Sequence, residues 1–185
     1  MGRKLKVTEM GRLSVEEFRR AEKMPLTVVL DNVRSMYNVG SVFRTSDAYR
    51  VERIVLCGIT GRPPHPEIHK TALGAEDAVA WTYCADTLDA VRRLQQEGVK
   101  VLAVEQAEGS IDLSQPQLPT PSAQQKIAVV LGNEVKGVQQ QVVDLCDGCL
   151  ELPQFGTKHS LNVATTAGIV IWEMFKRHTA TRRPL

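Results

Sequence analysis

Short apolar runs alternate along the chain with segments whose apolar residues recur at helical spacing. The runs are rich in Val, Ile and Leu and lack regular polar positions, so each is expected to be a strand buried on both faces. They fall at residues 25–31, 53–59, 78–83, 99–105, 126–131 and 149–152. Helices are predicted at residues 39–50, 67–73, 86–98, 138–146 and 160–177. This alternation predicts an α/β domain with a mostly parallel sheet and helices on both faces.

The beginning and the end of the chain differ from this pattern. Ser14 is followed three residues later by Glu17, which is a capping-box signature for a short helix before the first strand. We therefore predict an N-terminal helical extension at residues 1–24, a main domain at residues 25–178 and a basic C-terminal tail at residues 179–185. Residues 108–125 are rich in Ser, Pro and Gln and are expected to form a long connection.

The composition is that of an ordinary globular protein, with 43% hydrophobic and 24% charged residues among 185 and a net charge of +2. Seven of the 23 basic residues lie in two short segments at the ends, residues 3–6 and 176–183, where they could hold a phosphate backbone, although charge alone favours solvated ends. Neither a signal sequence nor an apolar run of the roughly 18 residues that span a membrane is visible. We expect a cytoplasmic protein with reduced thiols.

A metal site is not expected. Cys146 and Cys149 form a C-x-x-C pair, and His65 and His69 are four residues apart. The order of the two pairs and the long gap between them do not match the usual zinc spacings.

Glycines and polar side chains follow four of the predicted strands. In open α/β sheets the ligand binds outside the carboxyl ends of the strands, so these loops form the candidate site. They contain Asp31, Asn32, Arg34, Asn38 and Gly40; Glu105 and Gln106; Gly132, Asn133, Glu134 and Gly137; and Gly156, Lys158, His159, Ser160 and Asn162. Turn chemistry explains any single loop, whereas several at one edge favour a pocket. No P-loop, G-x-G-x-x-G or G-x-S-x-G motif occurs where it would be needed, which argues against the enzyme classes that depend on them.

The last predicted helix is apolar on almost all sides. Such a helix is expected to be buried all round, with one face on the sheet. The other face is expected to pack on a second copy of the chain in a two-fold dimer, and the alternative is that the N-terminal extension covers it.

Three segments together resemble the sequence motifs of a known family. They are "NVGSVFRTSDA" at residues 38–48, "VVLGNEVKGV" at residues 129–138 and "LPQFGTKHSLNVATTAGIVIWE" at residues 152–173. In order and spacing they are similar to the SpoU branch of the SPOUT methyltransferases, the TrmH-like RNA ribose 2′-O-methyltransferases. The likeness covers about residues 25–176. It implies a Rossmann-like sheet with a C-terminal trefoil knot, S-adenosyl-L-methionine as cofactor, a homodimer and a tRNA or rRNA substrate.

The resemblance also implies roles for individual residues. Matched by position, Gly132, Leu152 and Leu161 are cofactor-binding, and the catalytic set is Asn38, Arg44, Glu134, Ser160 and Asn162. A guanidinium stays charged at neutral pH, so Arg44 suits binding a phosphate and stabilising a developing alkoxide better than acting as a base. The proton of the 2′-hydroxyl would then be accepted either by water or by a neighbouring phosphate.

Several of these residues could instead have a purely structural role. Arg44 would otherwise form a surface salt bridge, and Asn38 and Ser160 would cap helices. Two other functions compete as well: a non-catalytic RNA-binding protein that keeps the fold, and a SPOUT enzyme that methylates a base. The first would show a broken motif and the second lacks the N-x-G-x-x-x-R segment, whereas all three motifs are complete here.

Overall fold

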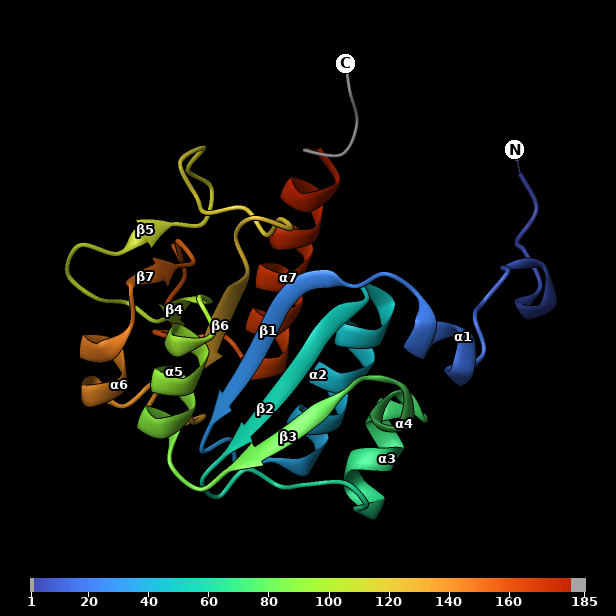
Figure 1. Cartoon of the computed structure of the whole chain (residues 1–185), viewed down its shortest axis with the longest axis horizontal. Coiled ribbons are helices and arrows are strands. Elements are labelled where there is room, and N and C mark those ends of the chain that lie inside the picture. Colours follow the sequence, from blue (N-terminus) through green and yellow to red (C-terminus); the bar gives the residue numbers. More distant parts are fainter. Residues whose placement is uncertain (1, 181–185) are drawn as a thin grey trace.

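A seven-stranded parallel sheet forms the centre of the protein (Figure 1). The computed structural model describes residues 2–180, so most of the predicted basic tail at residues 179–185 lies outside the described residues. The strands are β1 Met24–Asp31, β2 Val51–Cys57, β3 Trp81–Cys84, β4 Lys100–Val104, β5 Ile111–Asp112, β6 Ile127–Leu131 and β7 Gly148–Glu151. Their order across the sheet is β3-β2-β1-β6-β4-β7-β5, and every pair is parallel. The predicted α/β class and parallel sheet are confirmed.

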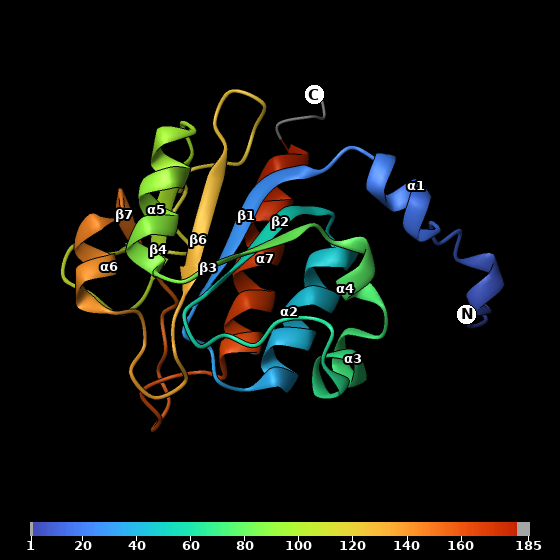
Figure 2. The same cartoon turned by 60° about the horizontal axis from the view of Figure 1, so that its bottom comes forward.

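Helices cover both faces of the sheet (Figure 2). They are α1 Val15–Arg20, α2 Met36–Ala48, α3 Pro66–Ala72, α4 Ala75–Ala78, α5 Thr87–Gln96, α6 Gln140–Leu145 and α7 Val163–Ala180, after a 3₁₀ turn at Val7–Glu9. Successive side chains of a strand point to opposite faces. On β1, Val28 and Leu30 belong to the core under α2 and α7, whereas Val29 belongs to the core under α5 and α6. This double burial is why the strands read as continuous apolar runs.

Two elements were not predicted, and several others begin two or three residues away from the predicted positions. The 108–125 connection contains the short strand β5, which pairs with β7, and α4 was not predicted. Helix α2 begins at Met36 because the hydroxyl of Ser35 accepts a hydrogen bond from the backbone N–H of Asn38. Helix α7 covers residues 163–180 instead of 160–177.

The exposed side of α7 is left uncovered by the rest of the described chain. Val170 and Ile171 are fully buried, but Ile169 is 40% exposed and Trp172 is 46% exposed. The N-terminal extension turns to another part of the molecule, because α1 packs against α4 and Arg19 donates a hydrogen bond to the carbonyl of Asp77. The extension therefore does not bury Ile169 and Trp172.

The return of the chain after β7 brings its last loop to the centre of the sheet. Strand β7 lies beyond β4 in the sheet, and residues 152–162 lead back to the start of α7. The trefoil knot expected for this segment stays a prediction. Among the described residues, no helix is long and apolar enough to cross a membrane.

Candidate active site

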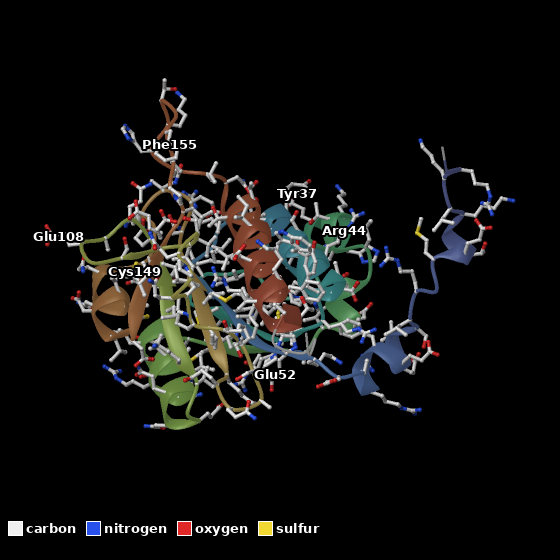
Figure 3. All side chains as sticks on the ribbon, turned by 90° about the horizontal axis from the view of Figure 1, so that it is seen from above. Tyr37, Arg44, Glu52, Glu108, Cys149 and Phe155 are labelled. Atoms are coloured by element: carbon white, nitrogen blue, oxygen red, sulfur yellow. The ribbon has the colours of Figure 1, made fainter. Side chains whose placement is uncertain are left out.

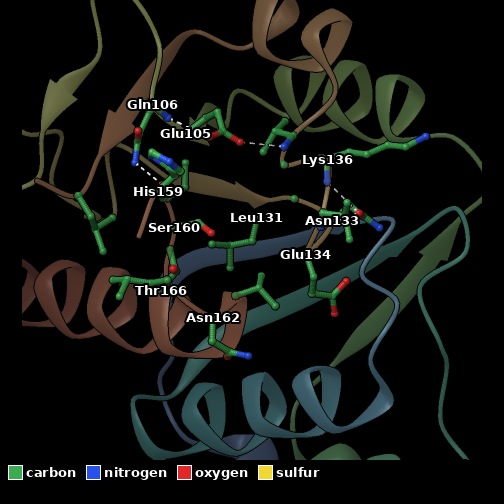
Figure 4. Close-up of a pocket in the computed structure, with 18 of the residues that line it drawn as sticks. Glu105, Gln106, Leu131, Asn133, Glu134, Lys136, His159, Ser160, Asn162 and Thr166 are labelled. Carbon is green, nitrogen blue, oxygen red and sulfur yellow. Dashed lines mark hydrogen bonds between the residues drawn. The ribbon is translucent and has the colours of Figure 1, made fainter. Parts of the chain in front are cut away.

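A cavity of about 700 Å³ opens at the carboxyl ends of β4, β6 and β7 (Figure 4). Three loops line it, at residues 104–106, 131–138 and 152–163, with Gln140 and Thr166 at its border. The volume is within the range of about 300–1,000 Å³ that is typical of small-molecule sites. The position is the one expected for a ligand in an open parallel sheet.

Six of the eight residues assigned from the resemblance line this cavity. They are Gly132, Glu134, Leu152, Ser160, Leu161 and Asn162. Asn38 is joined to them by hydrogen bonds, and Arg44 lies further along α2. The three motifs therefore meet in space, although they are up to about 120 residues apart in the sequence.

The turn after β6 is compact because of its glycine and its asparagine. A Cβ atom at Gly132 would lie 2.1 Å from the carbonyl carbon of Gly137, so no other residue fits without moving the backbone. Asn133 and Gly137 exchange two backbone hydrogen bonds, and the Asn133 side chain accepts from the N–H groups of Val135 and Lys136. The Asn133 amide also donates to the carbonyl of Asn32 at 2.7 Å, which attaches this turn to the end of β1.

Glu134 anchors the beginning of α2. One carboxylate oxygen accepts from the backbone N–H of Arg34 at 2.9 Å, and the other accepts from the N–H of Ser35 and from the Asn38 amide, both at 2.9 Å. Burial raises the pKa of Glu134, but the hydrogen bonds from Arg34, Ser35 and Asn38 outweigh it and leave this pKa below its ordinary value. The carboxylate form thus holds two distant segments together.

The orientation of each amide in this group follows from its neighbour. A carboxylate only accepts, so the NH₂ group of Asn38 must face Glu134 and its oxygen must face the other way. That oxygen accepts from the NH₂ group of Asn162 at 3.1 Å. The oxygen of Asn162 in turn accepts from the backbone N–H groups of Ala164 at 2.9 Å and Thr165 at 3.3 Å. Asn162 is therefore the residue that caps α7, and the expectation that Ser160 caps it is wrong.

Two polar site residues assigned from the resemblance have side chains without a polar contact in the described chain. Arg44 is exposed on α2, outside the cavity lining, and its guanidinium forms neither an ion pair nor a hydrogen bond with residues 2–180 (Figure 3). A surface salt bridge therefore does not account for it there. Ser160 is exposed and lines the cavity, with its hydroxyl free of partners among the same residues.

A second, open hollow of about 350 Å³ lies beside the cavity. It is lined by Arg34, Ser35 and Glu134. Glu134 borders both spaces, and its carboxylate is hydrogen-bonded to Asn38.

Other polar residues support the site; the sequence placed them in the candidate loops but gave none of them an individual role. The buried carboxylate of Asp31 accepts from the Thr87 hydroxyl at 2.6 Å and from the side-chain amide of Gln139 at 3.0 Å, which fixes the end of the loop after β6. Glu105 and Gln106 line the cavity from the end of β4. In the sequence, Glu105 and Gln106 can be recognised only by their position directly after a strand. The other polar loops follow strands at the same edge of the sheet. Within residues 2–180, no group of three His, Cys, Asp or Glu side chains could hold a metal ion.

A parallel sheet with a ligand cavity at its carboxyl edge, bordered by three separate polar motifs, defines an α/β protein with a small-molecule site at the edge of its sheet. Residues 25–172 match the model of the SpoU rRNA Methylase family, which is most of the chain. The protein therefore belongs to this family.

Named relatives support the same assignment. The chain is 28% identical over 165 residues to a 23S rRNA (guanosine-2′-O-)-methyltransferase of Pseudomonas syringae, covering 89% of this chain and 64% of the relative. It is 31% identical over 166 residues to the tRNA (guanosine(18)-2′-O)-methyltransferase of Thermus thermophilus, covering 90% of this chain and 82% of the relative. The structure is similar to that of an AdoMet-bound rRNA methyltransferase from Sinorhizobium meliloti, with a TM-score of 0.76 and 29% identity over 86% of this chain and 59% of that one.

The chain is shorter than several of these relatives. It spans less than two thirds of the Pseudomonas and Sinorhizobium proteins. The shared part is the domain that contains the cavity.

Proposed function

We propose that this protein methylates a ribose 2′-hydroxyl of tRNA or rRNA with S-adenosyl-L-methionine as the methyl donor. The observation that carries the proposal is the pair of adjoining spaces at the carboxyl edge of the sheet, which share Glu134 as a common wall. A methyl transfer needs a donor and an acceptor side by side. The larger and more enclosed cavity suits the donor, and the smaller, more open hollow suits a nucleotide that belongs to a large RNA.

The cavity fits the proposed cofactor in its size and lining. Val104, Val138, Leu152 and Leu161 provide apolar surface for a purine, and the close turn at Gly132 exposes backbone groups for polar contacts. Gly132, Leu152 and Leu161 are the residues that we propose to hold the cofactor. When bound, S-adenosyl-L-methionine supplies an electrophilic methyl group on a positively charged sulfur.

The side chains between the two spaces are proposed to position the acceptor ribose. Glu134 fixes the start of α2, and it fixes the direction in which the Asn38 amide points. Asn162 holds the oxygen of that amide from the other side. Ser160, whose hydroxyl has no partner in the described chain, is free to donate to or accept from a substrate at the cavity wall.

Arg44 is proposed to act on the RNA rather than on the cofactor. It is exposed, it lies six residues after Asn38 on the same helix, and it has no anionic partner within residues 2–180. An arginine fork binds a phosphate with two parallel hydrogen bonds and stabilises negative charge on a nearby oxygen. The hydroxyl proton is lost to water or to a phosphate as the oxygen attacks.

We further propose that the active form is a knotted, cytoplasmic homodimer. Ile169 and Trp172 on α7, with Tyr37 on α2, are large side chains that the single chain leaves more than a third exposed. Trp172 packs with Tyr49 and Phe175, so this aromatic group is preformed. A second copy would bury it, and two chains would double the basic segments that face a polyanion.

The function is tested by methyl transfer from labelled cofactor to total RNA from a strain that lacks the gene. We expect the wild-type protein to label this RNA and to leave RNA from the parent strain unlabelled, because the target site there is already methylated. Arg44→Ala is expected to bind the cofactor normally and to lose transfer. Arg93→Ala is the matched control, since Arg93 is exposed on α5 at the opposite face of the sheet. RNA binding without any transfer by the wild type would support the non-catalytic alternative.

A further inference from the structure

Glu105 is a carboxylate in the cavity wall that the proposed chemistry does not use. It follows directly after β4, is half-buried, and lines the cavity together with its neighbour Gln106. A carboxylate inside a partly apolar cavity is costly unless hydrogen bonds compensate it.

The backbone holds this carboxylate in one orientation. One oxygen accepts from the N–H of Val138 at 3.0 Å, and the other accepts from the N–H of Gln106 at 3.0 Å. Gly137 has a positive φ of 66°, and a Cβ atom there would lie 2.2 Å from the oxygen that faces Val138. A glycine is therefore required for Glu105 to approach the loop after β6 this closely.

Glu105 keeps acceptor capacity that nothing in the described chain uses. Each carboxylate oxygen can accept two hydrogen bonds, and each oxygen of Glu105 accepts one. No Lys, Arg or His within residues 2–180 forms an ion pair with it. The other cavity carboxylate, Glu134, already accepts three hydrogen bonds at the start of α2. Glu105 thus presents a preoriented, unpaired acceptor to a ligand.

The surroundings of Glu105 indicate which part of the ligand it meets. Val104, Val138 and Leu152 also line the cavity, and the backbone of Val138 contacts Glu105 directly. Glu105 lies across the cavity from Asn162 (Figure 4). The apolar side chains suit a purine, and the group attached to a purine is its ribose. The reacting end of the cofactor belongs at the opposite side, near Asn38 and Asn162.

We propose that Glu105 accepts hydrogen bonds from the ribose hydroxyls of the adenosyl group, an assignment that rests on the proposed function. Gln106 supports it as a positioning residue. Its side-chain amide donates to the carbonyl of His159 at 3.0 Å, which attaches the loop at residues 152–162 to the end of β4. The dipeptide therefore joins the two loops that enclose the cofactor.

The test uses the full-length protein, S-adenosylhomocysteine and its 2′,3′-dideoxy analogue, with affinities measured by calorimetry. Glu105→Gln keeps the shape of the side chain but loses acceptor capacity. We expect it to weaken S-adenosylhomocysteine binding by about 10- to 100-fold, as for other hydrogen bonds to a charged group, and to leave binding of the dideoxy analogue nearly unchanged. Glu108→Gln is the matched control, because Glu108 is exposed three residues further on and does not line the cavity.

Three results separate the possible failures. If the wild-type protein does not bind S-adenosylhomocysteine, the proposed function fails and this assignment fails with it. If Glu105→Gln weakens both ligands equally, Glu105 only supports the loop and the ribose assignment is overturned. If the loss disappears with 5′-methylthioadenosine, which keeps the ribose but lacks the amino-acid portion, Glu105 binds the ammonium group instead and the assignment is again overturned. Should Glu105→Gln not fold, Glu105→Asp gives the same comparison by withdrawing the carboxylate.

Discussion

Asn162 combines two tasks that a pair of substitutions can separate. Its oxygen caps α7 through the N–H groups of Ala164 and Thr165, and its NH₂ group holds the oxygen of Asn38. Asn162→Ala removes both. Loss of an N-cap costs about 1 kcal/mol, and loss of an exposed hydrogen bond costs about 0.5 kcal/mol more. For a chain of this size, a loss of that order lowers the melting temperature by about 3–6 °C.

Asn162→Asp removes only the second task. An aspartate still accepts from the two N–H groups, and its charge is favourable at a helix N-terminus. It cannot donate to Asn38, whose oxygen is turned toward it by Glu134. We therefore expect a melting temperature within about 2 °C of the wild type, together with a loss of methyl transfer of about 10-fold or more, because small displacements of positioning groups are costly.

Thermal unfolding and single-turnover methyl transfer on the same preparations decide the outcome. We expect Asn162→Ala to reduce both the melting temperature and the transfer rate, and Asn162→Asp to reduce only the transfer rate. Full transfer activity in Asn162→Asp would show that the contact between Asn162 and Asn38 does not position the reaction. An unchanged melting temperature in Asn162→Ala would refute the cap.

Three further substitutions test separate parts of the structure. Ser46 is fully buried and its hydroxyl has no partner among residues 2–180, so Ser46→Ala is expected to raise the free energy of unfolding by about 1 kcal/mol in urea; a decrease would indicate an unseen partner. The pKa of Glu134 is lowered in the folded state, so its stabilising effect is complete above its ordinary pKa of 4.5 and is lost as the pH falls through the folded value. The difference in melting temperature between wild type and Glu134→Gln should therefore shrink below pH 4.5, and a difference that grows there would contradict this sign. Gly132→Ala places a Cβ atom against Gly137 and should weaken cofactor binding by more than about 10-fold; unchanged calorimetric affinity would exclude the turn from the cofactor site.

The main strands and helices could be predicted because burial requires apolar residues at regular positions in the sequence. Strands β1 and β6 are buried on both faces, so their positions are apolar apart from Thr27 and Asp31 on β1. Strand β5 could not be found in this way, because it contains only Ile111 and Asp112 and gains its place by pairing with β7. The predicted start of α7 is wrong because Ser160 and Asn162 are both residue types that cap helices, and only the structure shows that the Asn162 oxygen accepts from the first N–H groups of the helix.

The candidate site was predicted in part for a similar reason. Polar loops after parallel strands indicated an edge of the sheet, and the resemblance selected residues on it. Neither source assigned a role to Asp31 or Glu105, because each acts on a loop more than 30 residues away. Helical spacing could not predict that Arg44 lies outside the cavity either. It indicates which face of α2 carries Arg44, but not how far that face lies from the loops that line the cavity.

The chemical position of the transferred methyl group tests the central claim most directly. RNA labelled by the protein from labelled S-adenosyl-L-methionine would be digested to nucleosides and separated with mass detection. The account predicts that the label is found in a 2′-O-methylnucleoside and that Arg44→Ala produces none. Label in a methylated base, or equal label from wild type and Arg44→Ala, would contradict it.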